Sequence, residues 1–156
     1  MEENYMVKPV VLDEQLCFSI YRAQKAYNHF YGKVLKPYGL TYPQFIAMLA
    51  LWEHGKMSVK ELGHHLELDS GTLTPLLKRL EADGWVSRNR ASDDERRVDV
   101  TLTEKAESQK EEIYERVGAC TNYLDFSSDK YHELRQEMNE VEHHLNAIQM
   151  DNARFS

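Results

Sequence analysis

The feature that most constrains this sequence is a pair of short, capped helices followed directly by a β-hairpin. Ser58-Val-Lys-Glu61 has the form of a capping box, in which a serine and a glutamate three residues later satisfy backbone donors at a helix start. A second helix is predicted to begin at Asp69-Ser-Gly71 and to end before Gly84, a residue suited to the left-handed position that follows a helix. Two short helices joined by a tight turn predict a helix-turn-helix.

After Gly84 the period of the apolar residues changes from that of a helix to that of a strand. Residues 85–88 are predicted to form one strand, residues 91–95 a polar loop, and residues 98–102, in which apolar and polar side chains alternate, a second strand. A helix-turn-helix followed by a hairpin is a winged helix. In a helix-turn-helix the second helix enters the major groove of DNA.

Polar and basic side chains gather on the predicted second helix and on the hairpin. Hydroxyl groups can bond phosphates or bases, Lys and Arg mainly fix the DNA backbone, and an arginine near the hairpin tip can enter a minor groove. One such charge alone is solvated surface in most proteins, but the ordered set favours a DNA-binding face. The candidates are Ser70, Thr72, Thr74, Lys78 and Arg79 on the helix and Arg96 and Arg97 on the hairpin.

Helical segments with narrow apolar seams lie on both sides of this region. Residues 16–34 and 134–148 each place apolar side chains at alternating spacings of four and three, which is one face of a helix. A narrow seam on an otherwise polar helix favours packing against a partner helix. The first seam is Leu16, Ile20, Ala23, Tyr27, Phe30 and Val34, and the second is Leu134, Met138, Val141, Leu145 and Ile148.

Two further helices are predicted between these segments. Pro37 and Gly39 end the first long helix, and Thr41-Tyr-Pro-Gln44 has the form of another capping box, which opens an apolar helix that stops near Gly55. A helix predicted from Thr103 ends at a break near residues 127–128. Its apolar stripe is Ile113, Val117, Cys120 and Leu124.

The bulk composition narrows the class of protein. A length of 156 residues, 42% of them hydrophobic, suffices for one ordinary domain with a core. No apolar run reaches about eighteen residues, and the first residues lack a signal-peptide pattern, so we expect a cytoplasmic protein without a membrane partner. The net charge of −7 arises mostly in residues 104–156, with six basic and twelve acidic side chains, and so leaves room for a local phosphate-binding face.

Neither the cysteines nor the histidines predict a metal site. Cys17 and Cys120 are far apart in the sequence and form no CxxC pair, so free thiols are expected in a reducing compartment. His64 and His65 are adjacent and face different ways on a helix, the 143–144 pair has only Glu142 beside it, and no HExxH occurs. We expect solvated histidines, no metal and no cofactor.

The wing carries a family resemblance. Asp94-x-Arg96, followed after five residues by Leu102-Thr103, resembles the wing signature of the MarR family, and residues 80–88 resemble that family's passage from recognition helix to wing. The resemblance extends over essentially the whole chain, and the family consists of dimeric winged-helix repressors and activators. It implies that Arg96 enters the minor groove, that Asp94 braces it, and that the terminal helices form the dimer interface.

This resemblance implies a mainly α-helical protein with a small β-hairpin wing. The expected organisation is a single domain over residues 1–156, with a winged helix-turn-helix at 41–103 and dimerisation helices at 1–40 and 104–156. The expected partners are a second copy of the chain and a palindromic operator in double-stranded DNA.

A second set of residues resembles the OhrR-type sensors of organic hydroperoxides within that family. These residues are Gln15-Leu-Cys17-Phe, Tyr31, Thr41-Tyr42-Pro-Gln44 and residues 68–75. In that group the cysteine matching Cys17 is oxidised, and tyrosines matching Tyr31 and Tyr42 hydrogen-bond it across the dimer interface. The chemistry agrees, because a thiolate attacks peroxides, and a helix start and phenolic donors both favour a negative sulfur, although desolvation acts against it.

Cys120 decides which kind of sensor the resemblance implies. OhrR-like proteins with one cysteine cap the sulfenic acid with a small thiol, whereas two-cysteine members close a disulfide to a late cysteine of the other subunit. Cys120 lies in the region of that late cysteine, but it also shares an apolar stripe with Val117 and Leu124, so core packing is the alternative.

Two other functions compete with the redox sensor. One is a MarR-type repressor released by a phenolic or drug-like ligand, which needs a pocket but no reactive cysteine. The other is a thiol peroxidase, although the chain lacks the alternating strand–helix pattern of such folds. We expect a regulator and not an enzyme.

Overall fold

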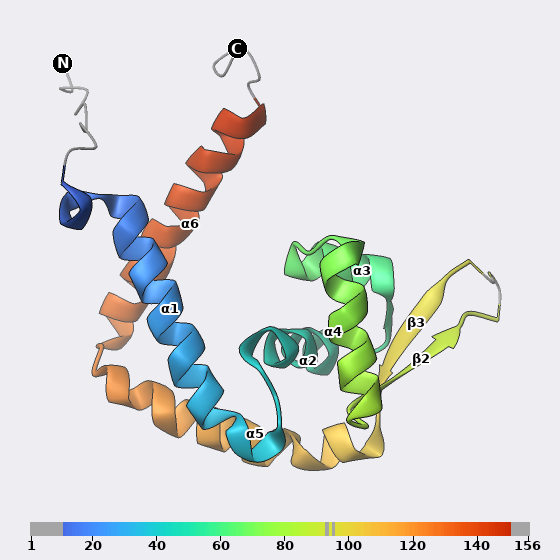
Figure 1. Ribbon diagram of the computed structural model, residues 1–156. Helices are drawn as coiled ribbons and strands as arrows, with labels where there is room; N and C mark the ends of the chain where they lie inside the picture. Colours follow the sequence, from blue (N-terminus) through green and yellow to red (C-terminus); the bar gives the residue numbers. More distant parts are fainter. Residues whose placement is uncertain (1–10, 93, 95, 151–156) are drawn as a thin grey trace. The chain divides into compact units, whose positions relative to one another are not determined.

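The computed structural model describes residues 11–92, 94 and 96–150, and Figure 1 shows the arrangement of its helices and strands. The chain groups into two compact units, Met1–Val117 and Gly118–Ser156. No helix among the described residues is both long enough and apolar enough to cross a membrane. The elements in chain order are η1 (Leu12–Glu14), α1 (Leu16–Val34), η2 (Lys36–Tyr38), α2 (Tyr42–His54), β1 (Met57–Ser58), α3 (Val59–Leu66), α4 (Ser70–Ala82), β2 (Val86–Arg90), β3 (Val98–Leu102), α5 (Glu104–Thr121), η3 (Asn122–Leu124) and α6 (Ser128–Met150).

The predicted helix starts of the winged region are confirmed. At α2 the backbone N–H of Thr41 donates to Gln44 Oε1 at 2.9 Å, and the return bond completes a capping box. At α3 the N–H of Ser58 donates to Glu61 Oε2 at 2.7 Å, and the N–H of Glu61 donates to Ser58 Oγ at 3.1 Å. Asp69 caps α4, and Gly84 follows that helix with a φ of +77°, the left-handed position that favours glycine.

The hairpin is confirmed, and the sheet has one strand that was not predicted. β2 and β3 pair antiparallel from Val86 opposite Leu102 to Arg90 opposite Val98, so β2 begins one residue later and ends two residues later than expected. β1, only two residues long, pairs with the other edge of β3 and gives the strand order β1-β3-β2. In Figure 1 the hairpin extends outward beside α4.

The core is formed by α2 together with α3, α4, the sheet and the first half of α5. Gly63 lets α3 and α4 approach closely, because a Cβ at this position would lie 3.0 Å from the Leu68 carbonyl oxygen and 3.4 Å from Leu73 Cδ2. Each large aliphatic side chain buried here contributes about 1.5–3 kcal/mol. The largest fully buried residues are Leu35, Met48, Leu51, Leu62, Leu73, Leu77, Leu80, Trp85, Val86, Val100 and Ile113.

Polar contacts attach α5 to the elements around it. Near its start, Thr103 Oγ1 donates to the Gly84 carbonyl at 2.6 Å and Lys105 Nζ donates to the Asp83 carbonyl at 2.7 Å. Further along, Arg116 Nε donates to the carbonyl of Val34, the last residue of α1, at 2.7 Å. α5 therefore contacts both the end of α4 and the end of α1.

The expected end of α5 is wrong by a few residues. The apolar stripe predicted a helix that continues through Leu124, but α5 ends at Thr121. Leu124 lies in the short turn η3, and Asp125 takes a left-handed conformation with φ of 53°. This conformation ends the turn before α6 begins at Ser128. The apolar stripe in the sequence therefore continues past the point where the helix ends.

Candidate nucleic-acid interface and thiol site

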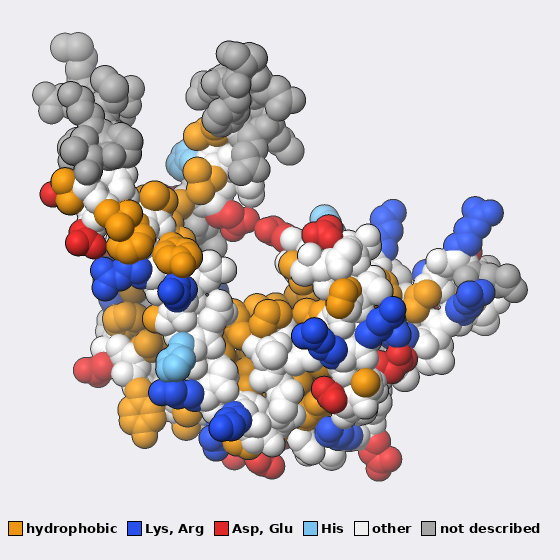
Figure 2. All heavy atoms as spheres, in the orientation of Figure 1, with side chains coloured by type: hydrophobic (Ala, Val, Ile, Leu, Met, Phe, Trp, Pro, Cys, Tyr) orange, Lys and Arg blue, Asp and Glu red, His pale blue; other side chains and the backbone are white. Residues whose placement is uncertain are grey.

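A groove of about 1000 Å³ lies between the α3–α4 pair and the wing. Of the residues predicted to contact DNA, it is lined by Ser70 and Thr74 from α4 and by Asp94, Arg96 and Arg97 from the wing. Figure 2 shows Lys and Arg side chains at the tip of the wing and beside α3 and α4. The other three predicted residues, Thr72, Lys78 and Arg79, are exposed on α4 but do not line the groove.

The start of α4 is held by Asp69. Its carboxylate accepts the backbone N–H of Thr72 at 2.9 Å and the Thr72 hydroxyl at 3.0 Å. These hydrogen bonds lower the pKa of Asp69, so the carboxylate stays charged at neutral pH. Because the Thr72 hydroxyl donates to Asp69, it is left with acceptor capacity toward a ligand.

Asp94 organises the turn of the wing through the backbone. Its carboxylate accepts the backbone N–H of Arg96 at 2.9 Å, and its carbonyl accepts the N–H of Arg97 at 2.9 Å. The bracing that the family resemblance implies therefore acts on the main chain of Arg96. Within the described part of the chain, the exposed Arg96 guanidinium has no ion pair or hydrogen-bond partner.

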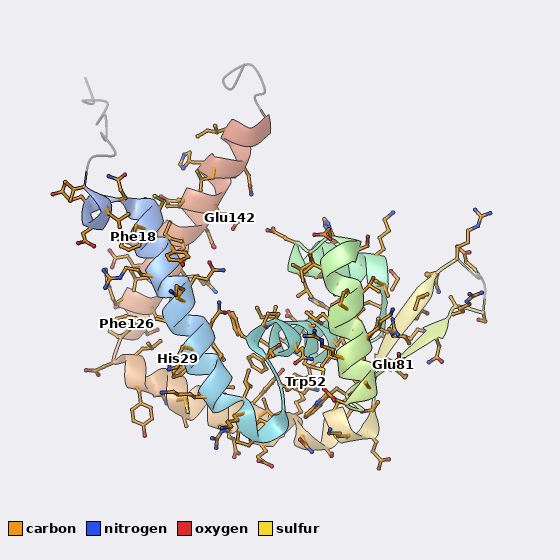
Figure 3. All side chains as sticks on the ribbon, in the orientation of Figure 1. Phe18, His29, Trp52, Glu81, Phe126 and Glu142 are labelled. Carbon is orange, nitrogen blue, oxygen red and sulfur yellow. The ribbon has the colours of Figure 1, made fainter. Side chains whose placement is uncertain are left out.

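Arg88 and Glu81 connect the wing to the recognition helix. The guanidinium of Arg88 donates to Glu81 Oε2 from Nε at 3.0 Å and from Nη2 at 2.6 Å, while the Arg88 backbone N–H donates to Oε1 at 3.0 Å. Hydrogen bonds from Arg88 lower the pKa of Glu81. Figure 3 labels Glu81 on the side of α4 that faces the hairpin. The paired groups fix the base of the wing against α4.

Arg97 lines the groove and also forms an ion pair with the buried Asp99. Its Nε lies 3.0 Å from Asp99 Oδ1, and Lys56 Nζ lies 3.1 Å from Asp99 Oδ2. Asp99 is only 5% exposed, and the hydrogen bond from Lys56, followed by that from Arg97, lowers its pKa. A DNA contact by Arg97 stays a prediction, because the same side chain satisfies a buried carboxylate.

The groove includes residues that the sequence analysis did not assign to DNA. Lys60 and His64 line it from α3, and Arg88 lines it from β2. Lys60 and His64 are four residues apart, a spacing that places both on one helix face. That spacing was the available signal, but only the position of the wing shows that this face borders the groove.

Cys17 lies in the second position of α1, where the helix start has no side-chain cap. The side chain of the N-cap residue Gln15 makes no capping hydrogen bond, while the N–H groups of Phe18 and Ser19 both donate to the Gln15 carbonyl at 3.1 Å. The thiol is free and exposed. Leu16 and Tyr21 beside it are 57% and 53% exposed, and Phe18 stacks on Tyr21 with ring centroids 6.2 Å apart. Figure 2 shows hydrophobic side chains gathered around the start of α1, and Figure 3 labels Phe18 there.

The two predicted tyrosines lie together but away from Cys17 of the same chain. Tyr31 of α1 and Tyr42 of α2 stack with ring centroids 4.4 Å apart, and both are half-buried. Tyr31 follows Cys17 by fourteen residues of one helix, which at 1.5 Å per residue is roughly 21 Å. The structure thus brings Tyr31 and Tyr42 together and leaves Cys17 beyond their reach within one subunit.

The remaining candidates are Cys120 and the histidines. Cys120 is a half-buried free thiol in the last turn of α5. His64 and His65 are both exposed, but the ring of His65 stacks on His54 with centroids 4.4 Å apart. The described residues contain no cluster of three or more His, Cys, Asp or Glu side chains that could hold a metal ion.

The family model described as "Transcriptional regulator SarA/Rot" matches residues 29–113, more than half of the chain. The HTH-type transcriptional regulator MgrA of Staphylococcus aureus is 40% identical over 133 residues, which cover 85% of this chain and 90% of MgrA. The chain belongs to the MarR/SarA family of winged-helix transcriptional regulators. This confirms the winged-helix fold and the DNA-binding regulatory role that the sequence predicts.

Other members of the MarR/SarA family resemble the chain over different extents. TtmR of Methylorubrum extorquens is 53% identical over 102 residues, but these are 65% of this chain and 52% of TtmR, so the chain spans about half the length of that relative. The structure of reduced AbfR bound to DNA is 38% identical in sequence, with a TM-score of 0.79, and the match covers 88% of this chain and 94% of the AbfR chain. AbfR of Staphylococcus epidermidis is also known in overoxidised, DNA-bound form and in disulfide form, with TM-scores of 0.74 and 0.64.

Proposed function

We propose that this regulator is a homodimeric repressor that senses organic hydroperoxides through Cys17 and releases its operator when Cys17 is joined to Cys120 of the partner subunit. The Cys17 thiolate attacks the peroxide, the O–O bond breaks, and an alcohol leaves while Cys17 becomes a sulfenic acid. The Cys120 thiol then attacks that sulfur, water leaves, and a disulfide forms. The thiol is consumed once for each oxidation, as in a switch and not in a catalyst.

The observation that carries this proposal is the position of Cys17. The thiol is free, exposed to solvent and close to the start of a helix, so an oxidant can reach its sulfur directly. The exposed apolar side chains of Leu16 and Tyr21 beside it suit a peroxide with an organic substituent. A cysteine kept for packing would instead be buried.

The distance between Cys17 and the tyrosines supports a dimeric sensor. Within one chain Tyr31 is roughly 21 Å along α1 from Cys17, and Tyr42 stacks on Tyr31, so these two phenols would have to reach the sulfur from a second subunit. The partner's Tyr31 and Tyr42 would then donate to the thiolate, as in the OhrR-type sensors that the sequence resembles. The apolar seams of α1 and α6 provide surface for such a dimer, and its two recognition helices would lie about 34 Å apart on a palindromic site.

The relatives support disulfide formation as the releasing step. AbfR is bound to DNA both when reduced and when overoxidised, and a separate structure contains its disulfide form. Overoxidation is thus compatible with DNA binding in that protein. We therefore propose that here the intersubunit disulfide, which constrains two helices at once, moves the recognition helices and lowers affinity.

A DNA-binding assay with stoichiometric cumene hydroperoxide, followed by a non-reducing gel and mass spectrometry of both cysteines, tests the proposal. Wild type should release DNA and run as a covalent dimer, while Cys17→Ser and Cys120→Ser should both stay monomeric on the gel. Cys17→Ser should keep its DNA affinity after oxidation. Tyr31→Phe and Tyr42→Phe should bind DNA when reduced and respond more slowly to peroxide.

Three results would contradict the proposal in different ways. A small thiol bound at Cys17 of wild type, without a covalent dimer, would show that Cys120 is a packing residue. Release of Cys17→Ser from DNA by a phenolic ligand would favour a ligand-controlled repressor. Sustained turnover of peroxide with an added reductant would indicate a peroxidase.

A further inference from the structure

The outward face of α3 carries two basic side chains that border the DNA-binding groove. Lys60 and His64 line it from α3, while Arg96 lines it from the wing on the opposite side. α3 is the first helix of the helix-turn-helix, the helix that crosses the DNA backbone when the second helix occupies the major groove. Side chains on this face of α3 are therefore placed to meet phosphates and not base edges.

We propose that His64 contacts a DNA phosphate in its protonated form, so that DNA binding takes up a proton and tightens as the pH falls. Histidine is the side chain whose charge ordinarily changes between pH 5 and 8. DNA brings phosphates next to the imidazole and favours its charged form. By linkage, a site that binds its proton more tightly in the complex makes the complex more stable at lower pH. This inference goes beyond the redox proposal and does not depend on it.

The charges around His64 come from three elements. Described charged residues that line the groove with it are Lys60 from α3, Glu67 directly after that helix, Arg88 from β2, and Asp94, Arg96 and Arg97 from the wing. α4 contributes only uncharged groove residues, among them Ser70 and Thr74. Of the cations, Arg88 is paired with Glu81 and Arg97 with Asp99, and both keep their charge throughout the range in which histidine titrates. Among the described residues that line the groove, His64 is the histidine, the residue type whose charge ordinarily changes near neutral pH.

His65 provides a matched control. It is the next residue on the same helix and is also exposed, but it is not among the residues that line the groove. Its ring stacks on His54 of α2, with an interplanar angle of 19°. Comparing substitutions at these two adjacent residues therefore distinguishes proton uptake in the groove from proton uptake elsewhere on α3.

The experiment measures binding of the reduced, full-length protein to a fluorescently labelled DNA duplex of mixed sequence, because phosphate contacts are independent of sequence. Anisotropy titrations are made with reductant present from about pH 8 to about pH 5.5, the range in which histidine titrates. The variants are His64→Gln, His64→Lys and the control His65→Gln. Thermal unfolding of each variant over the same pH range checks that the fold is kept.

The expected result is a wild-type affinity that rises by up to about tenfold from the upper to the lower pH, the change that one pKa unit of linkage gives. His64→Gln should lose most of this rise, and His65→Gln should keep it. His64→Lys should bind at the upper pH as tightly as wild type does at the lower pH. The slope of log affinity against log salt should steepen by about 0.9 at low pH in wild type only, one phosphate contact's share.

Two outcomes would overturn the inference. One is a pH profile and salt slope of His64→Gln that coincide with those of wild type, which would mean that His64 does not meet DNA. The other is an equal loss of affinity by His64→Gln at every pH, which would indicate a neutral hydrogen bond and no proton uptake. Neither outcome involves Cys17, so failure here leaves the redox proposal untouched.

Discussion

The apolar side chains of the winged-helix region are buried, whereas those of the last helix of the chain are exposed. On α4, Leu73, Leu77 and Leu80 are at most 1% exposed, whereas on α6 Met138 is 43% and Leu145 is 53% exposed. Both sets follow the spacing of one helix face. The difference shows that α4 finds its apolar partners within the chain, whereas the α6 seam leaves apolar surface uncovered, as a surface that binds a second copy would.

The helix starts differ in the same sense. At the starts of α2, α3 and α4, the N-cap side chain accepts a hydrogen bond from a backbone N–H of the helix. These N-cap residues are Thr41, Ser58 and Asp69. α1 begins at Gln15 without such a bond. The capped starts belong to the helices that carry or support the proposed DNA-binding surface, and the start without a side-chain cap carries the proposed reactive thiol.

The largest expected effect is on the buried face of α4. Leu77→Ala should lower the free energy of unfolding by about 2–5 kcal/mol, because the side chain is fully buried and its removal leaves a cavity. Leu145→Ala, measured in dilute protein where subunits are separate, should change it by no more than about 0.5 kcal/mol. Urea unfolding followed by circular dichroism measures both. Equal losses would mean that the two regions do not differ in the way their exposure indicates.

The second effect concerns association. Leu145→Glu should weaken the dimer by about 1.5–3 kcal/mol for each leucine that the interface buries. Sedimentation equilibrium measures the change. Gln136→Glu adds the same charge to an exposed position of α6 outside the seam, and it should leave association close to that of wild type. If both variants dissociate alike, charge and not the apolar seam controls the dimer.

The third effect separates two neighbouring arginines of the wing. Arg96→Ala should weaken DNA binding by about 1–3 kcal/mol, the range of a groove contact, without changing the melting temperature. Arg97→Ala should lower the melting temperature, because the buried Asp99 loses one of its two cations. Binding isotherms at fixed salt, together with thermal melts, distinguish the two roles. An unchanged affinity of Arg96→Ala at physiological salt would contradict the assignment of the wing tip.

Local signals in the sequence were enough to predict most of the winged region. Capping residues such as Ser58 and Asp69 act within one turn of the chain, and the alternation of residues 98–102 is visible in the sequence itself. β1 escaped prediction because two residues carry no period, and its pairing partners Val100 and Asp99 lie far along the chain. The end of α5 was misplaced because an apolar stripe continued past the backbone turn at Asp125.

The site was predicted less completely than the fold. Residue type and spacing suggested Ser70, Thr74 and Arg96, and the groove brings these together. The strand alternation predicts an exposed polar side chain at Asp99, yet Asp99 is buried, with its carboxylate paired to Arg97 just before β3 and to Lys56 just before β1. Lys60 and His64 line the groove only because the wing forms its opposite side. Such roles depend on where distant segments meet, which a single sequence does not state.

The smallest expected effect is on the pH dependence of the two regions. In the winged region the shifted carboxyls, among them Glu81 and Asp99, have lowered pKa values because Arg88 and Lys56 donate to them. Their contribution to folding is fully present above the pKa of an unfolded carboxyl, about 4, and is lost as the pH falls through the lower folded pKa. Among the described residues of the last unit, Lys130 has a raised pKa because it donates a hydrogen bond to Glu133. Its contribution to folding is present below the pKa of an unfolded lysine and is lost as the pH rises through the folded value. Acid should therefore loosen the wing before it affects α6, and Glu81→Gln should flatten the acid side of the stability curve. Hydrogen exchange of β2 and α6 amides as the pH is lowered measures this order, and loss of protection in α6 first would reverse it.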